Sequence, residues 1–266
     1  MFKKYIKPSA SIIKYLFNNH RKKIPVDEKK NLNNQEKNLL NQLKKNGYAV
    51  IKNFLSEENC KAIIEILDNV IEKYPNKIWR DEHDSDNRIF GAEIIDQKIM
   101  KYFNDDLIYR VGETYCDCKI KNQMVMANRV NFSSKNKGSG SGWHKDAYRR
   151  QFKSLLYLHK VNKSNGPFQL IKGSNKFFNS FRVATKLQKT YRDTRFTNEE
   201  VLSISKENDI ETLEGDVGTL ILFDPTLIHR GAPLESFKRY ALTNYYESLR
   251  NFDTSINHYQ PRFNFN

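Results

Sequence analysis

The chain has 266 residues, of which 12% are aromatic, and its 45 Lys and Arg residues against 31 Asp and Glu residues give a formal net charge of +14. The aromatic content excludes an intrinsically disordered chain, and the 11 Gly and 7 Pro exclude a collagen-like or low-complexity one. No run approaches the roughly 20 apolar residues that span a bilayer, so we expect no transmembrane segment. Basic and acidic residues are interleaved along the chain, which makes a nucleic-acid partner an unfavoured interpretation of the charge.

The first 34 residues are basic and rich in Asn, and we predict a weakly ordered lead-in here. Residues 9–18 can form a short amphipathic helix, which would either pack on the domain or contact a membrane surface. The region lacks the apolar run of a cleavable signal. Cys60, Cys116 and Cys118 have no metal or redox spacing, so we expect a cytoplasmic protein.

Helical periodicity dominates the next part of the chain. Gln35 to Lys45 places three Leu residues on one face, and a short strand follows at residues 48–51. Ser56 is a suitable N-cap for a second helix that continues to about Tyr74. A third helical period covers Asp96 to Tyr115.

From residue 120 onward, short apolar and aromatic runs separated by Gly, Asn, Pro and Ser predict antiparallel strands. These runs are Met124–Phe132, Ser154–Val161, Phe168–Ile171, Val217–Phe223 and Ala241–Tyr246. Helices followed by such strands predict an α+β, mainly β, fold around a sandwich or small barrel. We expect one domain over residues 35–250, with an insertion or lid at about 177–212 and a C-terminal tail at 251–266.

Two histidines and one aspartate form the chemically informative pattern. His144 and Asp146 are two residues apart, so in an extended segment both side chains point to one face while Lys145 points away. His229 follows a predicted strand much later in the chain. Two His and one carboxylate form the facial triad of non-haem Fe(II) oxygenases, which leaves metal positions open. Arg239, ten residues after His229, can clamp a carboxylate with its planar guanidinium.

Taken with further motifs, these residues resemble the phytanoyl-CoA dioxygenase-like family of Fe(II)/2-oxoglutarate oxygenases, over roughly residues 38–248. The motifs that carry the resemblance are Asn46–Ser56, Gly142–Asp146, Leu156–Leu158, Asn165–Phe168, Lys172–Lys176, Gly215–Val217 and His229–Gly231. The resemblance implies a double-stranded β-helix, or jelly roll, with N-terminal helices packed on the major sheet and a metal in its mouth.

The resemblance also implies a role for each motif residue. His144, Asp146 and His229 would hold Fe(II), and Arg239 would bind the C5 carboxylate of 2-oxoglutarate. The implied reaction consumes O₂, converts 2-oxoglutarate to succinate and CO₂, and hydroxylates an unactivated C–H bond. Halogenating relatives lack the carboxylate ligand, so the presence of Asp146 favours hydroxylation. No catalytic side chain beyond the metal centre is needed.

The family places a polar residue near 2-oxoglutarate, on the strand before the His-x-Asp motif. Asn131 fits this role by position, and Arg129 and Tyr157 are further candidates. Ordinary sheet packing is the alternative interpretation for each of them.

Basic and aromatic residues near the metal motif suggest the substrate. Arg149, Arg150 and Arg230 would select an anionic small molecule if they line the mouth, or form a solvated basic face if they do not. Trp143 and Tyr148 flank the motif and pack either on a substrate or in the core.

Other functions remain open at this level. A cupin-like metal protein could use the same barrel without O₂ chemistry, but it would not need Arg239. A nucleic-acid-directed oxygenase would show a basic groove leading to the metal. A scaffold that has lost its activity would not need the intact triad.

Overall fold

The computed structural model describes residues 10–15, 25–26, 31–206, 209–249 and 262–265. Most of the predicted lead-in and residues 251–261 of the predicted tail therefore lie outside the described residues. Within the lead-in, residues 10–15 form a helix whose Ile12 is buried against Tyr148 and Ala184. In the described part of the chain, no helix is both long and apolar enough to cross a membrane.

Six longer helices and two short 3-10 turns follow in the described ranges after residue 31. They are α2 (Asn34–Asn46), α3 (Glu57–Lys73), η1 (Pro75–Lys77), η2 (Ala92–Ile94), α4 (Gln97–Phe103), α5 (Asp106–Cys116), α6 (Phe177–Leu187) and α7 (Asn198–Ile204). The strands are β1 (Tyr48–Ile51), β2 (Trp79–Arg80), β3 (Asp86–Phe90), β4 (Ile120–Asn131), β5 (Phe152–Tyr157), β6 (Phe168–Ile171), β7 (Ile210–Leu213), β8 (Leu220–Phe223), β9 (His229–Gly231) and β10 (Lys238–Ser248).

Side-chain caps set the helix boundaries. Asn33 and Glu36 form a capping box at the start of α2, and the Ser56 hydroxyl caps α3 as predicted. The single helix predicted over residues 96–115 is wrong, because the chain forms two helices there. Asp105 adopts an extended conformation and accepts a hydrogen bond from the Ile108 N–H, so its side chain begins a new helix.

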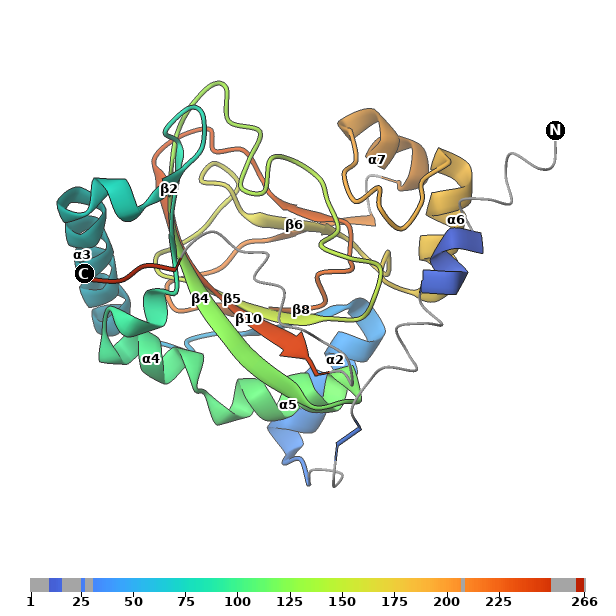
Figure 1. The fold of residues 1–266 in the computed structure, drawn as a ribbon, viewed down its shortest axis with the longest axis horizontal. Coiled ribbons are helices and arrows are strands. Elements are labelled where there is room, and N and C mark those ends of the chain that lie inside the picture. Colours follow the sequence, from blue (N-terminus) through green and yellow to red (C-terminus); the bar gives the residue numbers. More distant parts are fainter. Residues whose placement is uncertain (1–9, 16–24, 27–30, 207–208, 250–261, 266) are drawn as a thin grey trace.

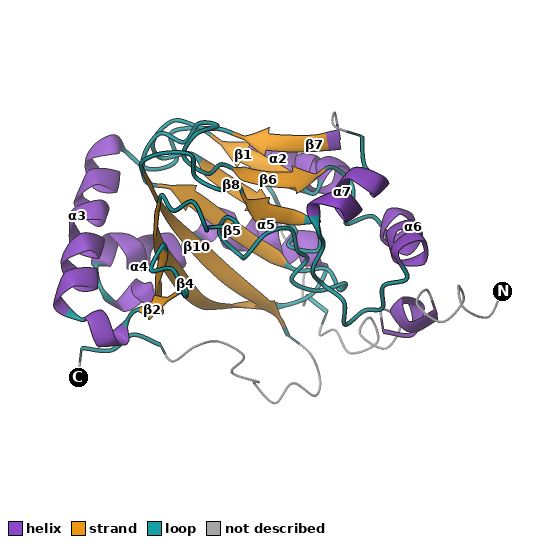
Figure 2. Ribbon diagram, turned by 90° about the horizontal axis from the view of Figure 1, so that it is seen from above, coloured by secondary structure: helices purple, strands orange, loops and turns teal. Residues whose placement is uncertain are grey.

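Two antiparallel sheets form the jelly roll. The larger has seven strands in the order β1-β8-β5-β10-β4-β3-β2, and the smaller has three in the order β7-β6-β9. The sheets face each other across an apolar layer that includes Tyr157 from the large sheet and Phe168 and Leu170 from the small one. Figure 1 shows β6 above β5, β8 and β10, and Figure 2, seen from above, shows α3 and α4 at one end of the strands and α6 and α7 at the other. The predicted fold class is confirmed.

Strand β10 shows how the large sheet divides its side chains between two environments. Tyr240 and Leu242 point to the helices and join the main core, whereas Arg239, Ala241 and Thr243 point between the sheets. Helices α2, α4 and α5 cover the outer face of this sheet (Figure 1). Both faces of the large sheet are therefore buried, as in a domain with a helical layer and a β layer.

The predicted insertion holds α6, α7 and β7. Its helices lie at the end of the molecule opposite α3 (Figure 1) and pack through Val183 and Val201 on Trp143. Of the predicted tail, residues 262–265 pack back on the domain. The Phe263 ring is buried against Tyr74, and its backbone N–H donates to the carbonyl of Phe90.

Candidate metal centre

Backbone pairing brings two distant histidines together. The N–H of His144 donates to the carbonyl of His229 over 2.9 Å, and the N–H of His229 donates to the carbonyl of His144 over 2.8 Å. This isolated bridge joins the loop after β4 to β9, and it holds the two imidazole centroids 4.3 Å apart.

Both imidazoles are oriented by the carbonyl of the residue two positions earlier. Nδ1 of His144 lies 2.9 Å from the Gly142 carbonyl, and Nδ1 of His229 lies 2.9 Å from the Leu227 carbonyl. Because a carbonyl only accepts, each Nδ1 carries the proton and each Nε2 presents a lone pair. This outer contact is typical of metal-ligating histidines.

Asp146 completes the donor set. Its Oδ1 lies 3.4 Å from Nε2 of His144 and 3.9 Å from Nε2 of His229, and the three ligand atoms lie within 4.8 Å of one another. Two neutral imidazole nitrogens and one carboxylate oxygen match the facial triad for Fe(II). The residues present therefore fit an iron ion, and the structure brings together all three predicted ligands.

Protonation states favour metal binding at these residues. Burial and, to a smaller extent, the neighbouring His144 lower the pKa of His229 to about 3, so this ring stays neutral. Burial alone would raise the pKa of Asp146, but Lys153 and the two histidines outweigh it and hold the pKa well below its usual range. Asp146 is therefore an anion when the imidazoles are neutral.

Glycine at two positions makes room for the site. A Cβ on Gly140, whose φ is +85°, would lie 2.4 Å from the His144 ring. A Cβ on Gly231 would lie 2.7 Å from a terminal nitrogen of Arg239. Larger residues at these positions would displace the ligand and the guanidinium, respectively.

A cavity of about 110 Å³ opens beside the triad, and Arg239 lies in its wall. The Arg239 side chain is buried, and one terminal nitrogen donates to the carbonyl of Gly166. Its Nε is buried with no hydrogen-bond partner among the described residues. Burial lowers the pKa of Arg239, yet a guanidinium keeps its charge in proteins. A buried cation with a spare donor fits a small carboxylate such as one end of 2-oxoglutarate.

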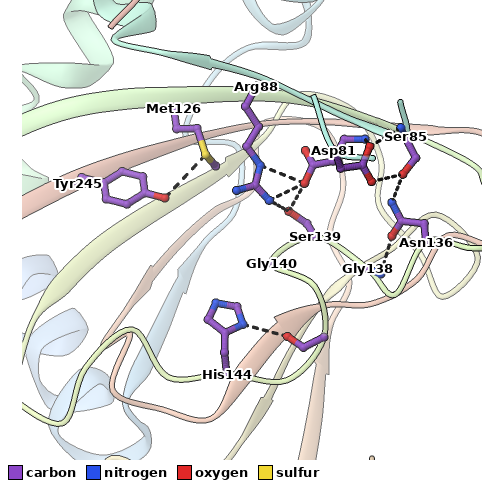
Figure 3. A network of polar contacts seen from close by, with 12 residues as sticks. Asp81, Ser85, Arg88, Met126, Asn136, Gly138, Ser139, Gly140, His144 and Tyr245 are labelled. Atoms are coloured by element: carbon purple, nitrogen blue, oxygen red, sulfur yellow. Dashed lines mark hydrogen bonds and ion pairs between the residues drawn. The ribbon is translucent and has the colours of Figure 1, made fainter. Parts of the chain in front are cut away.

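A polar network on β3 and β4 forms another wall of the cavity. Arg88 donates from Nε and from a terminal nitrogen to Oδ2 of Asp86, over 3.0 and 2.5 Å. Ser139 contacts the same Asp86 oxygen at 3.3 Å (Figure 3). Asn128 is buried in the same wall, next to Arg88 in the pairing of β3 with β4.

Two predicted cosubstrate residues lie on the other face of the large sheet. Arg129 donates to Asp68 of α3 over 2.8 Å, on the side of the helices. Asn131 lies two residues after Arg129 in β4, so its side chain is expected on the same face of the sheet. It is not among the residues that line the cavity. The residues of β4 that line the cavity are Met126 and Asn128, and Asn128 is the polar one of the two.

Tyr157 does point between the sheets, but its hydroxyl is already occupied. The hydroxyl donates to the carbonyl of Leu213 over 2.9 Å and accepts from the N–H of Phe168 over 2.8 Å. Tyr157 is fully buried and lies close enough to Arg239 to interact with its charge. Its position therefore supports the cavity wall and leaves no hydroxyl proton for a ligand.

The aromatic residues beside the motif belong to the core. Trp143 is buried among apolar residues between the small sheet and α6 and α7. Tyr148 is buried against Ile12, and its hydroxyl donates to the carbonyl of Asp193. Neither lines the cavity, so the core interpretation of both residues holds.

The predicted basic residues also point elsewhere. Arg150 donates to the carbonyl of Tyr115 and lies over its ring, and Arg230 donates to Gln169 and Asn198. Arg149 is partly exposed and does not line the cavity. The basic side chains that do line it are Arg88, Lys153 and Arg239.

Sequence reasoning assigned no site role to Arg88 or Asn128. The i, i+2 spacing of Asp86 and Arg88 in a strand was the available signal for Arg88, because both side chains then share a face. No comparable signal marked Asn128, because β4 is buried on both faces.

Lys145 points away from the metal, as predicted, and anchors the motif. Its fully buried ammonium donates to the carbonyls of Ser174 and Thr226, over 2.8 and 2.6 Å, and to the Ser180 hydroxyl over 3.1 Å. Burial lowers its pKa to about 7. These bonds tie the His-x-Asp segment to α6 and to the turn before β9.

The Lys145→Met substitution is expected to lower the free energy of unfolding by about 2–3 kcal/mol, because it leaves buried carbonyls without a donor. Urea unfolding of the metal-free protein measures this loss. Lys160→Met is the control, because Lys160 is exposed and only 3.6 Å from an equally exposed Asp216. Equal stability of the two variants would contradict the anchoring role.

Comparison with known proteins agrees with this geometry. Residues 43–239, most of the chain, match the family described as phytanoyl-CoA dioxygenase (PhyH). No curated protein sequence matches the chain.

Several solved structures share the fold at low sequence identity. EctD from S. alaskensis, with 2-oxoglutarate and 5-hydroxyectoine, is 17% identical, with a TM-score of 0.59 over 85% of this chain and 83% of that one. The epimerase SnoN, in complex with Fe³⁺, alpha ketoglutarate and nogalamycin RO, is 12% identical, with a TM-score of 0.58 over 80% and 84%. HygX from Streptomyces hygroscopicus, with nickel, 2-oxoglutarate and hygromycin B, is 14% identical, with a TM-score of 0.55 over 81% and 87%. The chain belongs to the phytanoyl-CoA dioxygenase family of iron- and 2-oxoglutarate-dependent dioxygenases.

Proposed function

We propose that the chain hydroxylates an unactivated C–H bond of a small polar molecule, with iron held by His144, Asp146 and His229 and 2-oxoglutarate anchored on Arg239. The single observation that carries this proposal is the buried, unpartnered Nε of Arg239 in the wall of the same cavity as the triad. Bound iron would supply O₂ activation coupled to the decarboxylation of 2-oxoglutarate.

The protein's own contribution is positioning and exclusion of water. The triad would occupy three positions on one side of the metal and leave the others for ligands. Arg239 would orient the cosubstrate by pairing with its far carboxylate. Apolar side chains of Leu155, Phe168 and Phe223 line the cavity and limit the access of water to the metal.

A metal-binding protein without O₂ chemistry is the competing function. Such a protein has no use for a buried guanidinium next to its metal, and burying one is costly without a partner. The buried position of Arg239 in the cavity wall therefore favours an oxygenase over a metal-binding protein without O₂ chemistry.

A second cavity of about 360 Å³ shares Arg88 with the metal cavity, and we place the small-molecule substrate there. Its other lining residues include Lys135 and Lys137 but also Asp81 and Glu82. Mixed charge suits a polar molecule that carries donors and acceptors. A strictly anionic substrate loses support, because Arg150 and Arg230 point away from both cavities.

The similar structures support a small-molecule substrate, since EctD, SnoN and HygX were crystallised with 5-hydroxyectoine, nogalamycin RO and hygromycin B. No observation favours a nucleic acid. We also propose a reducing, cytoplasmic location, which the buried and unbridged Cys60, Cys116 and Cys118 support.

Anaerobic titration with Fe(II) and 2-oxoglutarate tests the proposal. We expect a weak visible charge-transfer band that appears only when both are present, and succinate release once O₂ is admitted. The band is expected to be absent from His144→Ala. A wild-type protein without the band, or a His144→Ala variant that retains it, would refute the assignment.

A further inference from the structure

Lys153 of β5 lies in the metal cavity and contacts a metal-ligand candidate directly. Lys153 and Leu155 line the cavity, whereas Phe152 and Leu156, which alternate with them, join the main core on the side of the helices. The Lys153 ammonium forms a salt bridge with Oδ2 of Asp146. Neither the facial-triad pattern nor the family likeness assigns a role to this residue.

The two oxygens of the Asp146 carboxylate thus have different partners. Oδ1 faces Nε2 of His144 and of His229, at 3.4 and 3.9 Å. Oδ2 accepts a hydrogen bond from the Lys153 ammonium. A carboxylate held in this way offers one oxygen to a metal.

The Lys153 side chain is itself held in place. Its ammonium lies 3.7 Å from the centroid of the Tyr245 ring, and the two residues are direct neighbours in the pairing of β5 with β10. On the other side β5 pairs Lys153 with Phe223, whose ring packs on His229. Only 12% of the Lys153 side chain is exposed. The sheet therefore fixes the ammonium relative to the triad.

The contact between Lys153 and Asp146 matters because it affects how many ligand positions on an iron ion the protein would occupy. With three protein ligands, an iron ion that takes six ligands would have three positions left, and 2-oxoglutarate together with O₂ would need all three. A carboxylate that bound through both oxygens would take one of them. Occupation of Oδ2 by a fixed ammonium prevents this.

We infer that Lys153 is a positioning residue that keeps Asp146 a one-oxygen ligand and so preserves the positions that 2-oxoglutarate occupies. The inference rests on the proposed function, since it concerns the same metal. A substrate-anchoring role for Lys153 fits less well, because its ammonium is already engaged by Asp146 and by the Tyr245 ring.

The test uses Co(II), whose visible absorption reports coordination number, and measures cofactor binding without turnover. In Lys153→Met we expect Co(II) to bind within about threefold of wild type, since the three ligands remain. The affinity of the Co(II)-loaded protein for 2-oxoglutarate is expected to fall at least tenfold, with an altered visible spectrum. Lys153→Arg, which keeps a charged donor for Oδ2, is expected to restore both.

Lys172→Met is the matched control, because Lys172 forms a lysine–carboxylate pair with Glu211 at 3.0 Å on the surface. Circular dichroism establishes folding first, and Lys153→Ala carries the same expectation if Lys153→Met does not fold. A Lys153→Met protein with wild-type spectrum and 2-oxoglutarate affinity would overturn the inference and leave the proposed function intact. So would a variant that loses Co(II) altogether, since the residue would then support the whole site. Failure of the wild-type protein to bind 2-oxoglutarate would instead refute the proposed function.

Discussion

Replacing His229 by Gln is expected to abolish iron binding in the micromolar range and, with it, succinate formation. His229 is buried between the rings of Phe168 and Phe223, with ring centroids 5.4 and 5.6 Å away, and His144, the other described imidazole in the cavity, is itself a ligand candidate. Loss of an outer contact to a metal ligand already costs roughly 10- to 100-fold in affinity, and loss of the ligand costs more. Gln preserves most of the side-chain volume, so the fold is retained.

The measurement is an anaerobic Fe(II) titration followed by a succinate assay after O₂ is admitted. His159→Gln is the matched control, because His159 follows β5 outside the cavity and its Nε2 accepts a hydrogen bond from the N–H of Tyr240. The control is expected to bind iron like the wild type. Undiminished iron affinity in His229→Gln would show that the bridge between His144 and His229 has a structural role only.

Replacing Arg239 by Met is expected to weaken 2-oxoglutarate binding by roughly two orders of magnitude, because a charge-assisted hydrogen bond is worth about 1.5–3 kcal/mol. Metal affinity is expected to stay unchanged, since Arg239 is not one of the three ligand candidates and its guanidinium donates to the carbonyl of Gly166. Arg239→Lys keeps the charge but loses the planar pair of donors, so an intermediate affinity is expected.

The measurement is 2-oxoglutarate affinity of the Mn(II)-loaded protein, by calorimetry. Arg230→Met is the matched control, since it removes an equal charge from a side chain that hydrogen-bonds to Gln169 and Asn198, outside the cavity. If Arg239→Met and Arg230→Met bind 2-oxoglutarate equally well, Arg239 is not the anchor. The proposed cosubstrate site would then have to be reassigned to Arg88, the other guanidinium in the cavity.

Local signals in the sequence were sufficient for most of the fold. Caps at Ser56 and alternating apolar runs from residue 120 predict elements that the structure contains, with β4 and β10 longer than expected. The strands β2, β3, β7 and β9 escaped prediction because each has five residues or fewer and none shows a clear run of apolar residues at strand spacing. The break between α4 and α5 was not predicted, because the apolar residues keep a helical period through it. The side chain of Asp105 nevertheless caps a new helix there.

The predicted metal ligands are the residues that the structure brings together, while the other predicted site residues are mostly misplaced. His144 and Asp146 share one short segment, so their convergence follows from extended geometry alone. Asn131 and Arg129 do not line the cavity, because they alternate along β4 with Asn128, and alternate residues of a strand point to opposite faces. Since both faces of the large sheet are covered, alternation between polar and apolar residues does not reveal which side of β4 holds the cavity.

The sequence by itself predicted the reaction class, because the His-x-Asp pair, the later histidine and the arginine ten residues beyond it, together with further motifs, resemble those of the phytanoyl-CoA dioxygenase family. Only the tertiary structure shows which Lys and Arg side chains line the cavity beside the metal-ligand candidates. Among the residues that the structure describes, three Lys and Arg side chains line the cavity, and Arg88 and Lys153 reach it from separate strands. The net charge of +14 does not show which basic residues line the cavity. The contact of Lys153 with Asp146 depends on the register of the large sheet, which is set by pairings between residues far apart in the chain.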